Sequence, residues 1–140
     1  MVHHEYVALN NGVWNKSASV DFDIVVSDSL TAHNVFLNIR NDDRYEFSNL
    51  FLIVQLRSPD GNTQIDTLEY EMASPTGEWL GTGMGSVKES KLWYRENVDF
   101  SNMGVYKLRV AHAMRKNGEV DGLENLLGIT DVGVEVEKIQ

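Results

Sequence analysis

The 140-residue chain contains no cysteine, and this absence removes several kinds of chemistry. Without cysteine there is no disulfide bond, no thiol nucleophile and no zinc site with cysteine ligands. Long hydrophobic runs are lacking as well. The longest, Leu50–Val54, is far shorter than the roughly 20 apolar residues that a membrane-spanning helix needs. The cysteine content does not fix the cellular compartment.

Positive charge is scarce, because 12 lysines and arginines face 21 aspartates and glutamates for a net charge of −9. Such a surface repels phosphate backbones, so we expect no nucleic-acid partner. An anionic membrane is disfavoured as a docking surface for the same reason. The acidity itself is an ordinary property that keeps a small domain soluble. A basic protein or a divalent cation stays open as a ligand.

Convincing helical periodicity is also missing, and an alternation of period two dominates instead. Residues 20–26 place Phe22 and Ile24 on one face with Asp21 and Asp23 opposite, which predicts a half-buried strand. The same pattern predicts strands over residues 35–40, 105–112 and 131–137.

Residues 50–56 are apolar on both faces, as expected of a strand inside a sheet. The segment Ser58–Asn62 combines Pro59 with Gly61 and predicts a turn. We therefore expect a hairpin between residues 50–56 and 64–72.

A chain of this length fits one domain, and short strands separated by turns predict an all-β fold. We expect an antiparallel β-sandwich, jelly-roll or immunoglobulin-like, with at most a short helix. That helix would lie within Val120–Leu127, with Leu123, Leu126 and Leu127 packing inward.

No motif predicts catalysis, a cofactor or a metal ion. The glycines of residues 81–85 lack the strand-loop-helix context of a nucleotide site and favour a tight strand connection. His112 has no neighbouring nucleophile motif and is expected to be structural. The acidic residues at 42–43 and 60 lack calcium-loop spacing and favour solvated turns. We therefore predict a protein that is not an enzyme.

Among the residues that could contact a partner or ligand, the aromatic ones are the most informative. If Trp93 and Tyr94 lie in a strand, they point to opposite faces, so that one of them is exposed. Trp79 favours the core, as most tryptophans do. Arg115 predicts a polar rim or a solvated loop. These four residues are the candidate contacts for a partner or ligand.

Several segments, in this order along the chain, together resemble the GldH gliding-motility lipoprotein family of the Bacteroidota. They are Asn38–Asn41, Tyr45–Leu52, Asp66–Glu69, Gly77–Gly83, Ala113–Arg115 and Leu127–Lys138. The similarity extends from about Trp14 to Lys138. We therefore expect a GldH-like sandwich domain over residues 14–140, preceded by a tether or cloning remnant over residues 1–13.

The resemblance implies a lipoprotein of the cell envelope, acylated on a cysteine that this sequence does not contain. The membrane contact would be an N-terminal lipid anchor outside this sequence, facing the periplasm or the cell surface. The resemblance also implies an accessory role in gliding motility and type IX secretion, exerted by binding other envelope proteins. It supplies no catalytic residues. The paired aromatics leave an alternative open, a carbohydrate-binding β-sandwich module.

Overall fold

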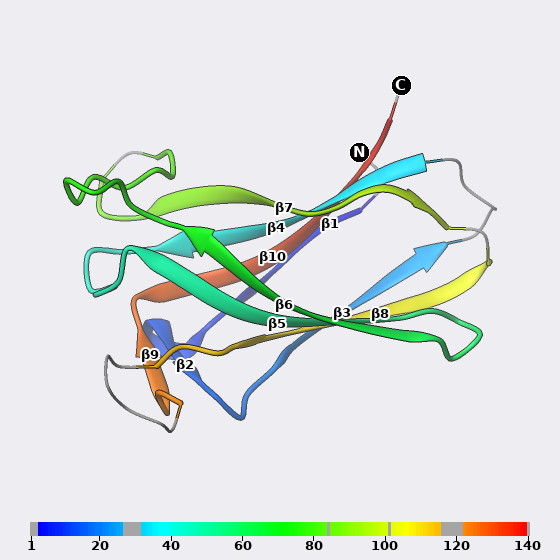
Figure 1. Cartoon of the computed structure of the whole chain (residues 1–140), viewed down its shortest axis with the longest axis horizontal. Coiled ribbons are helices and arrows are strands. Elements are labelled where there is room, and N and C mark those ends of the chain that lie inside the picture. Colours follow the sequence, from blue (N-terminus) through cyan, green and yellow to red (C-terminus); the bar gives the residue numbers. More distant parts are fainter. Residues whose placement is uncertain (1–2, 27–31, 84, 101, 116–121, 140) are drawn as a thin grey trace.

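The computed structural model describes residues 3–26, 32–83, 85–100, 102–115 and 122–139, and they form two packed antiparallel sheets (Figure 1). The first sheet has four strands in the order β1 (His3–Ala8), β10 (Ile129–Lys138), β4 (Ala32–Asn41) and β7 (Lys88–Asp99). The second sheet has the order β3 (Val20–Val26), β8 (Gly104–His112), β5 (Asn49–Arg57) and β6 (Thr63–Glu71).

The strand order identifies the sandwich as a jelly roll. If the eight long strands are numbered one to eight along the chain, the sheets have the orders 1-8-3-6 and 2-7-4-5. This is the jelly-roll arrangement of two four-stranded sheets. The prediction of an all-β antiparallel sandwich is confirmed, and the topology selects the jelly roll over the immunoglobulin-like alternative.

The core lies between the two sheets and follows directly from the alternation in the sequence. In β3 every second residue is buried, and Phe22 and Ile24 face inward while Asp21 and Asp23 face solvent. Each large side chain that is buried in this way stabilises the fold by roughly 1.5–3 kcal/mol. Leu37 of β4 and Leu52 of β5 are fully buried in the same cluster.

A two-stranded ribbon covers one end of the sandwich. It consists of β2 (Val13–Asn15) and β9 (Asn125–Leu127), and a short 3₁₀ turn, η1 (Asn10–Gly12), leads into it. Trp14 of β2 is fully buried, and its indole Nε1 donates a hydrogen bond to the carbonyl oxygen of Ala18 at 2.8 Å. The ribbon therefore completes the core at this end.

The predicted hairpin is confirmed, since β5 pairs with β6 across the turn at Ser58–Asn62. Gly61 has a φ of +92° there, and its amide donates to the carbonyl of Ser58 at 3.0 Å. A positive φ is accessible to glycine without steric cost, which is the physical basis of the turn signal.

Two expectations for the ends of the chain need correction. Residues 122–127 form no helix, because Asn125–Leu127 pairs with β2; Leu126 is buried while Leu127 faces outward. Residues 120–121 lie outside the described residues. His3–Ala8 was expected to be a tether, but it forms the edge strand β1 and pairs with β10. The sandwich therefore includes residues before position 14.

Candidate partner-binding surfaces

Trp93 and Tyr94 are adjacent in β7 and point in different directions, as the sequence predicted for a strand. The Trp93 side chain lies on the outer face of the first sheet and is 52% exposed. Its ring centroid lies 4.4 Å from that of Phe36, which is only 5% exposed. Trp93 is therefore an accessible aromatic ring that is supported from below by a nearly buried one.

The Tyr94 side chain lies instead on the side of the sandwich that the edge strands β6 and β7 form. It packs against the core, and the guanidinium of Arg95 lies 5.3 Å from the centroid of its ring. The pairing of β7 with β4 shifts register at this point, so Tyr94 is an extra residue between Trp93 and Arg95. Such a bulge breaks the strict alternation of a strand. Burial raises the pKa of the Tyr94 phenol.

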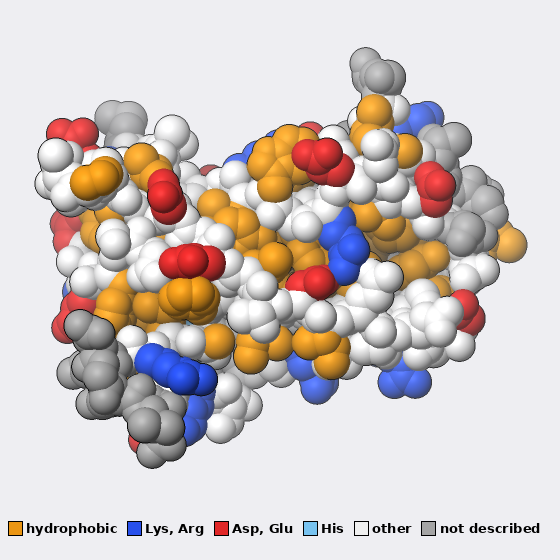
Figure 2. Space-filling model, viewed as in Figure 1, with side chains coloured by type: hydrophobic (Ala, Val, Ile, Leu, Met, Phe, Trp, Pro, Cys, Tyr) orange, Lys and Arg blue, Asp and Glu red, His pale blue; other side chains and the backbone are white. Residues whose placement is uncertain are grey.

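The bulge lets β7 contact the opposite sheet. Arg95 makes an ion pair with Asp66 of β6 at 2.5 Å, and both side chains are partly exposed. The Tyr70 hydroxyl of β6 donates to the main-chain carbonyl oxygen of Trp93 at 2.6 Å. Figure 2 shows this side of the molecule, with hydrophobic side chains visible between polar ones. The two edge strands are thus joined across the sandwich.

Trp79 and Arg115 lie away from Trp93. Trp79 follows β6, forms a bridge with Ala73, and packs against the core with its ring 6.2 Å from that of Tyr45. Arg115 is exposed just beyond β8 and lines a groove of about 370 Å³ with Phe47 and Met114, among others. The four candidate residues therefore occupy separate places, and no single surface collects them.

A polar network that the sequence analysis did not identify surrounds the Trp93 face. Asn38 of β4 donates through Nδ2 to Glu135 of β10 at 3.1 Å. Lys91 of β7 approaches Glu135 at 3.1 Å and Glu137 at 2.6 Å, and its ammonium lies 4.3 Å from the centre of the Phe36 ring. A hydrogen bond with Glu137, followed by those from Asn38 and Lys91, lowers the pKa of Glu135 to about 2.

The network continues toward β1. The Tyr6 hydroxyl donates to Glu89, and the guanidinium of Arg40 lies 4.0 Å above the Tyr6 ring. A Cβ on Gly133 would lie 2.7 Å from the Tyr6 ring, so only glycine lets this ring rest on β10. A hollow of about 500 Å³ adjoins the network and is lined by Tyr6, Lys91 and Leu80, among others.

The other residues that the sequence analysis considered have structural roles. His112 is buried, packs edge-to-face against Trp14 at 5.5 Å, and accepts a hydrogen bond from the amide of Met114 at 3.2 Å. Burial lowers the pKa of His112. Thr82, within the glycine-rich loop, bridges to Glu89 at the edge of β7, as expected of a strand connection.

Neither acidic turn is arranged as a metal site. Asp42 binds Arg44 in an ion pair at 2.8 Å, and Asp60 accepts a hydrogen bond from the amide of Asn62 at 3.1 Å. In the part of the chain that the structure describes, no group of three or more histidine, aspartate or glutamate side chains could hold a metal ion.

The helical content of the described residues is a single short turn, and none of it is long and apolar enough to cross a membrane.

Comparison with known proteins confirms the resemblance. The family model of the GldH lipoprotein matches residues 1–136. A gliding motility lipoprotein GldH homolog of Christiangramia forsetii is 51% identical over 137 residues, covering 98% of this chain and 83% of that protein. The gliding motility lipoprotein GldH of Flavobacterium johnsoniae is 45% identical over 137 residues, covering 98% of this chain and 84% of that protein.

Among solved structures, one of infectious bursal disease virus, Gx strain, has a TM-score of 0.37 and 10% identity. The match covers 94% of this chain and 31% of the viral chain. A TM-score this low supports no inference. The match of the family model over nearly the whole length, together with the two relatives, is decisive. The chain belongs to the GldH lipoprotein family.

Proposed function

We propose that this chain is the folded domain of a membrane-anchored envelope lipoprotein that serves gliding motility by binding other envelope proteins. Family membership and the motility role named for both relatives support the proposal. The proposed partners are components of the motility and type IX secretion machinery. The lipid anchor would precede β1, so that the domain faces the periplasm or the cell surface. No catalytic step is assigned to it.

The observation that carries this proposal is the exposed ring of Trp93 on a pre-arranged surface. Tryptophan is among the residues that contribute most to binding free energy at protein interfaces. The Trp93 ring rests on Phe36, and neighbouring Lys91 is fixed by Glu135 and Glu137. A ring that is ordered before binding loses little conformational entropy when a partner covers it.

The carbohydrate-binding alternative has weaker support. A sugar platform would need Trp79, Trp93 and Tyr94 to form one exposed strip of rings. Trp93 is exposed on the outer face of the first sheet, whereas Trp79 and Tyr94 pack against the core. The three rings therefore offer no common stacking surface, and protein binding is the function that the geometry favours.

The experiment introduces a photo-crosslinking amino acid at position 93 of the full-length, acylated protein in its own cells. We expect crosslinks to motility or secretion components, and we expect Trp93→Ala to reduce co-purification of the same components at least about fivefold. Met103→Ala is a matched control, because Met103 is an exposed hydrophobic residue outside this face. Its co-purification should equal that of the unaltered protein.

Two results would overturn the proposal. Position 93 could yield no crosslink to these components, although the protein is abundant in the envelope. Alternatively, Trp93→Ala could unfold the isolated domain, which would assign the ring to the core. Trp93→Phe separates these outcomes, since it keeps an aromatic ring over Phe36 and should retain both folding and binding.

A further inference from the structure

The outermost strand of the second sheet, β6, turns a row of main-chain groups away from its neighbour β5. At the turn of the β5–β6 hairpin, the amide of Ser58 donates to the carbonyl of Asn62 at 2.8 Å. At the other end, the amide of Met72 donates to the carbonyl of Ser48 at 2.7 Å. Bonded and non-bonded pairs alternate along an antiparallel ladder, so the even-numbered residues of β6 bond to β5. The odd-numbered residues therefore point their N–H and C=O groups outward: Thr63, Ile65, Thr67, Glu69 and Glu71.

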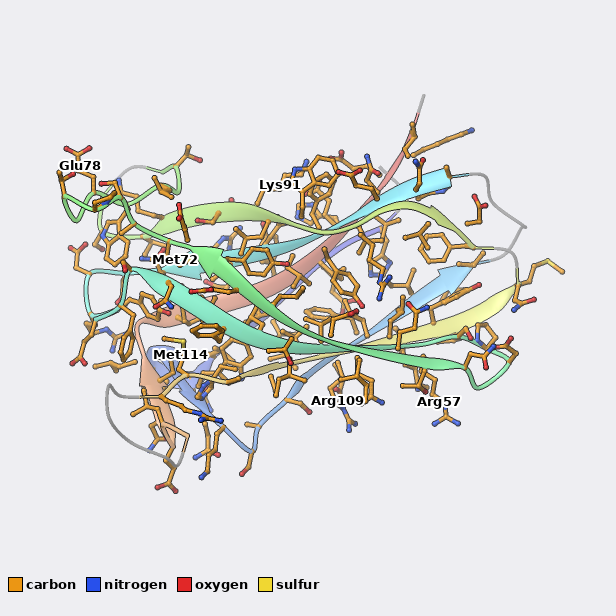
Figure 3. The ribbon with its side chains drawn as sticks, viewed as in Figure 1. Arg57, Met72, Glu78, Lys91, Arg109 and Met114 are labelled. Atoms are coloured by element: carbon orange, nitrogen blue, oxygen red, sulfur yellow. The ribbon has the colours of Figure 1, made fainter. Side chains whose placement is uncertain are left out.

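This outward row is accessible along its whole length. All of its residues are exposed, and it spans about 27 Å at roughly 3.4 Å per residue. In the part of the chain that the structure describes, β6 pairs with β5 alone, and no further main-chain hydrogen bond reaches the row. In Figure 3, β6 runs between Arg57, which pairs with Thr63, and Met72, which follows Glu71. The edge therefore offers free donors and acceptors to another strand.

The neighbouring edge strand, β7, is built differently. Its pairing with β4 shifts register at Tyr94, Asn97 has a φ of +55°, and Thr82 bridges to Glu89 near its start. β6 pairs with β5 without a register shift, and its sequence contains no proline and no lysine. Bulges, prolines and lysines are the usual features that keep an edge strand from pairing with another chain. β6 lacks all three.

One inward-facing charge on β6 is compensated within the chain. Asp66 lies opposite the fully buried Val54 and so faces the inside of the sandwich. Inward-pointing charges are another device that protects an edge strand from pairing. Arg95 of β7 neutralises this one in an ion pair at 2.5 Å. The free side of β6 is therefore not blocked by an unpaired inward charge.

The surroundings of the row indicate the charge of its occupant. No lysine or arginine occurs between Arg57 and Lys88, whereas five acidic residues do. Two of them, Glu69 and Glu71, belong to the row and lie on the same outer face of the sheet. Glu69 accepts a hydrogen bond from the neutral side chain of Asn49 at 3.0 Å. Within the described residues, neither glutamate makes an ion pair. A strand that pairs here is stabilised by positive charge beside them.

We propose that β6 is a docking strand, to which an extended basic segment of a partner protein adds as a further strand of the second sheet. Main-chain hydrogen bonds to the outward row supply the affinity, as in other complexes formed by strand addition. Two lysine or arginine side chains of the segment, two positions apart, lie beside Glu69 and Glu71. Beside Ile65 and Thr67 the segment presents β-branched side chains. Its basic residues are confined to one end, because Arg57 lies at the other end of the row.

Charge distinguishes this occupant from two others. A second copy of the chain, paired through the same edge, would bring Glu69 and Glu71 of both copies together, and β6 contains no cation to offset them. An anionic lipid surface would be repelled by the same glutamates. The inference goes beyond the proposed function, because it concerns a main-chain contact on the other sheet.

The experiment selects random peptides displayed on phage against the folded 140-residue chain. We expect enrichment of peptides that are rich in β-branched residues and carry two basic residues two positions apart. Thr67→Pro removes one outward N–H and leaves the ladder to β5 intact, because an edge strand tolerates proline where the nitrogen faces solvent. An enriched peptide, made synthetically, should bind Thr67→Pro about tenfold more weakly. Thr67→Ala is the matched control, since it keeps the N–H and should bind like the unaltered chain.

The charge is tested with a second pair of variants. Glu69→Gln combined with Glu71→Gln should weaken binding of the same peptide about fivefold. Glu78→Gln removes an exposed carboxylate in the loop beyond β6, where Figure 3 shows it at the end of the molecule, and should leave affinity unchanged. Urea midpoints identify any variant that fails to fold. If Thr67→Pro does so, N-methylation of alternate peptide amides gives the same test on the unaltered chain, and methylation in one phase alone should abolish binding.

The proposal is wrong if no peptide is enriched, if the enriched peptides show no basic preference, or if folded Thr67→Pro and Thr67→Ala bind equally. It is also wrong if methylation in both phases has the same effect. Self-association of the unaltered chain that Thr67→Pro abolishes would assign the edge to a second copy instead. The proposed function is tested separately, since crosslinks at position 93 can succeed when the peptide selection fails, and the reverse is equally observable.

Discussion

The surroundings of Gly128 predict a large difference between two glycine substitutions. Gly128 and Gly61 have nearly the same conformation, with φ of +97° and +92°. Gly61 has open space where a Cβ would be. A Cβ on Gly128 would lie 2.7 Å from the Cα of Tyr45 and 2.9 Å from the carbonyl carbon of Arg44. Both contacts are with backbone, so no side-chain rotation relieves them.

The free-energy cost of each substitution can be worked out separately. Gly61→Ala should lower the free energy of unfolding by about 1 kcal/mol, because a left-handed alanine costs about 1–2 kcal/mol and restriction of the unfolded chain offsets part of it. Gly128→Ala carries the same cost and also displaces the chain around Tyr45. In this variant we expect strain in two hydrogen bonds, the one from the Gly128 amide to the Gly12 carbonyl and the one from the Asp42 amide to the Gly128 carbonyl. At about 1 kcal/mol for each hydrogen bond, the total cost is about 3 kcal/mol.

Urea unfolding followed by tryptophan fluorescence measures both variants. The difference of about 2 kcal/mol should move the midpoint of Gly128→Ala about 1 M below that of Gly61→Ala. Equal midpoints would refute the reasoning, because they would show that the segment around Tyr45 moves aside without cost.

Two further predictions concern the polar contacts. The folded pKa of Glu135, about 2, lies below its ordinary value of 4.5, so the carboxylate stabilises the fold above pH 4.5 and this contribution is lost as pH falls toward 2. Glu135→Gln should abolish this pH-dependent contribution. Parallel urea midpoints for the two proteins between pH 5 and pH 2.5, roughly the titration range, would contradict the prediction. Tyr70→Phe removes the bond to the Trp93 carbonyl and should cost about 1 kcal/mol in urea unfolding, whereas an unchanged midpoint would show that the cross-sheet bond adds nothing.

Most of the long strands could be predicted because their alternation is local. The alternation within Val20–Val26 is sufficient to predict a strand, and the turn at Gly61 identifies the strand that pairs with β5. The strand order could not be predicted in the same way. Val134 of β10 lies opposite Glu5 of β1 on one side and Leu37 of β4 on the other. The sequences of these three strands do not indicate that they pair. Pairings across nearly the whole chain decide between a jelly roll and other sandwiches.

The errors have local physical causes. β7 carries a bulge at Tyr94, and the extra residue disrupts the alternation that would have marked the strand. Leu123, Leu126 and Leu127 have a spacing that suits a helical turn, but pairing with β2 makes Asn125–Leu127 a strand. His3–Ala8 is short and polar, and it forms a strand because β10 offers it a partner. In each case tertiary pairing overrides the local pattern.

The candidate site could be predicted only in part. Adjacent aromatics in a strand must face opposite ways, so the sequence identified the Trp93–Tyr94 pair as the place where one ring is exposed. It could not identify Phe36 as the support, because β4 was interpreted as half-buried and Phe36 lies on its outer face. Asn38 and Glu135 are 97 residues apart, and only the β4–β10 register makes them neighbours.

The charged side chains on the two outer faces of the sandwich are paired to different extents. On the first sheet, Lys91 and Glu135 satisfy each other and hold the surroundings of Trp93 in one arrangement. On the second sheet, Arg57 and Lys107 face each other, and solvent-exposed aspartates neutralise them only in part. The first surface presents a ring within a network of paired charges, whereas the second carries exposed ion pairs and, within the described residues, one arginine, Arg57, that makes no ion pair. Because the packed core separates the two faces, the contacts on one face do not depend directly on those of the other.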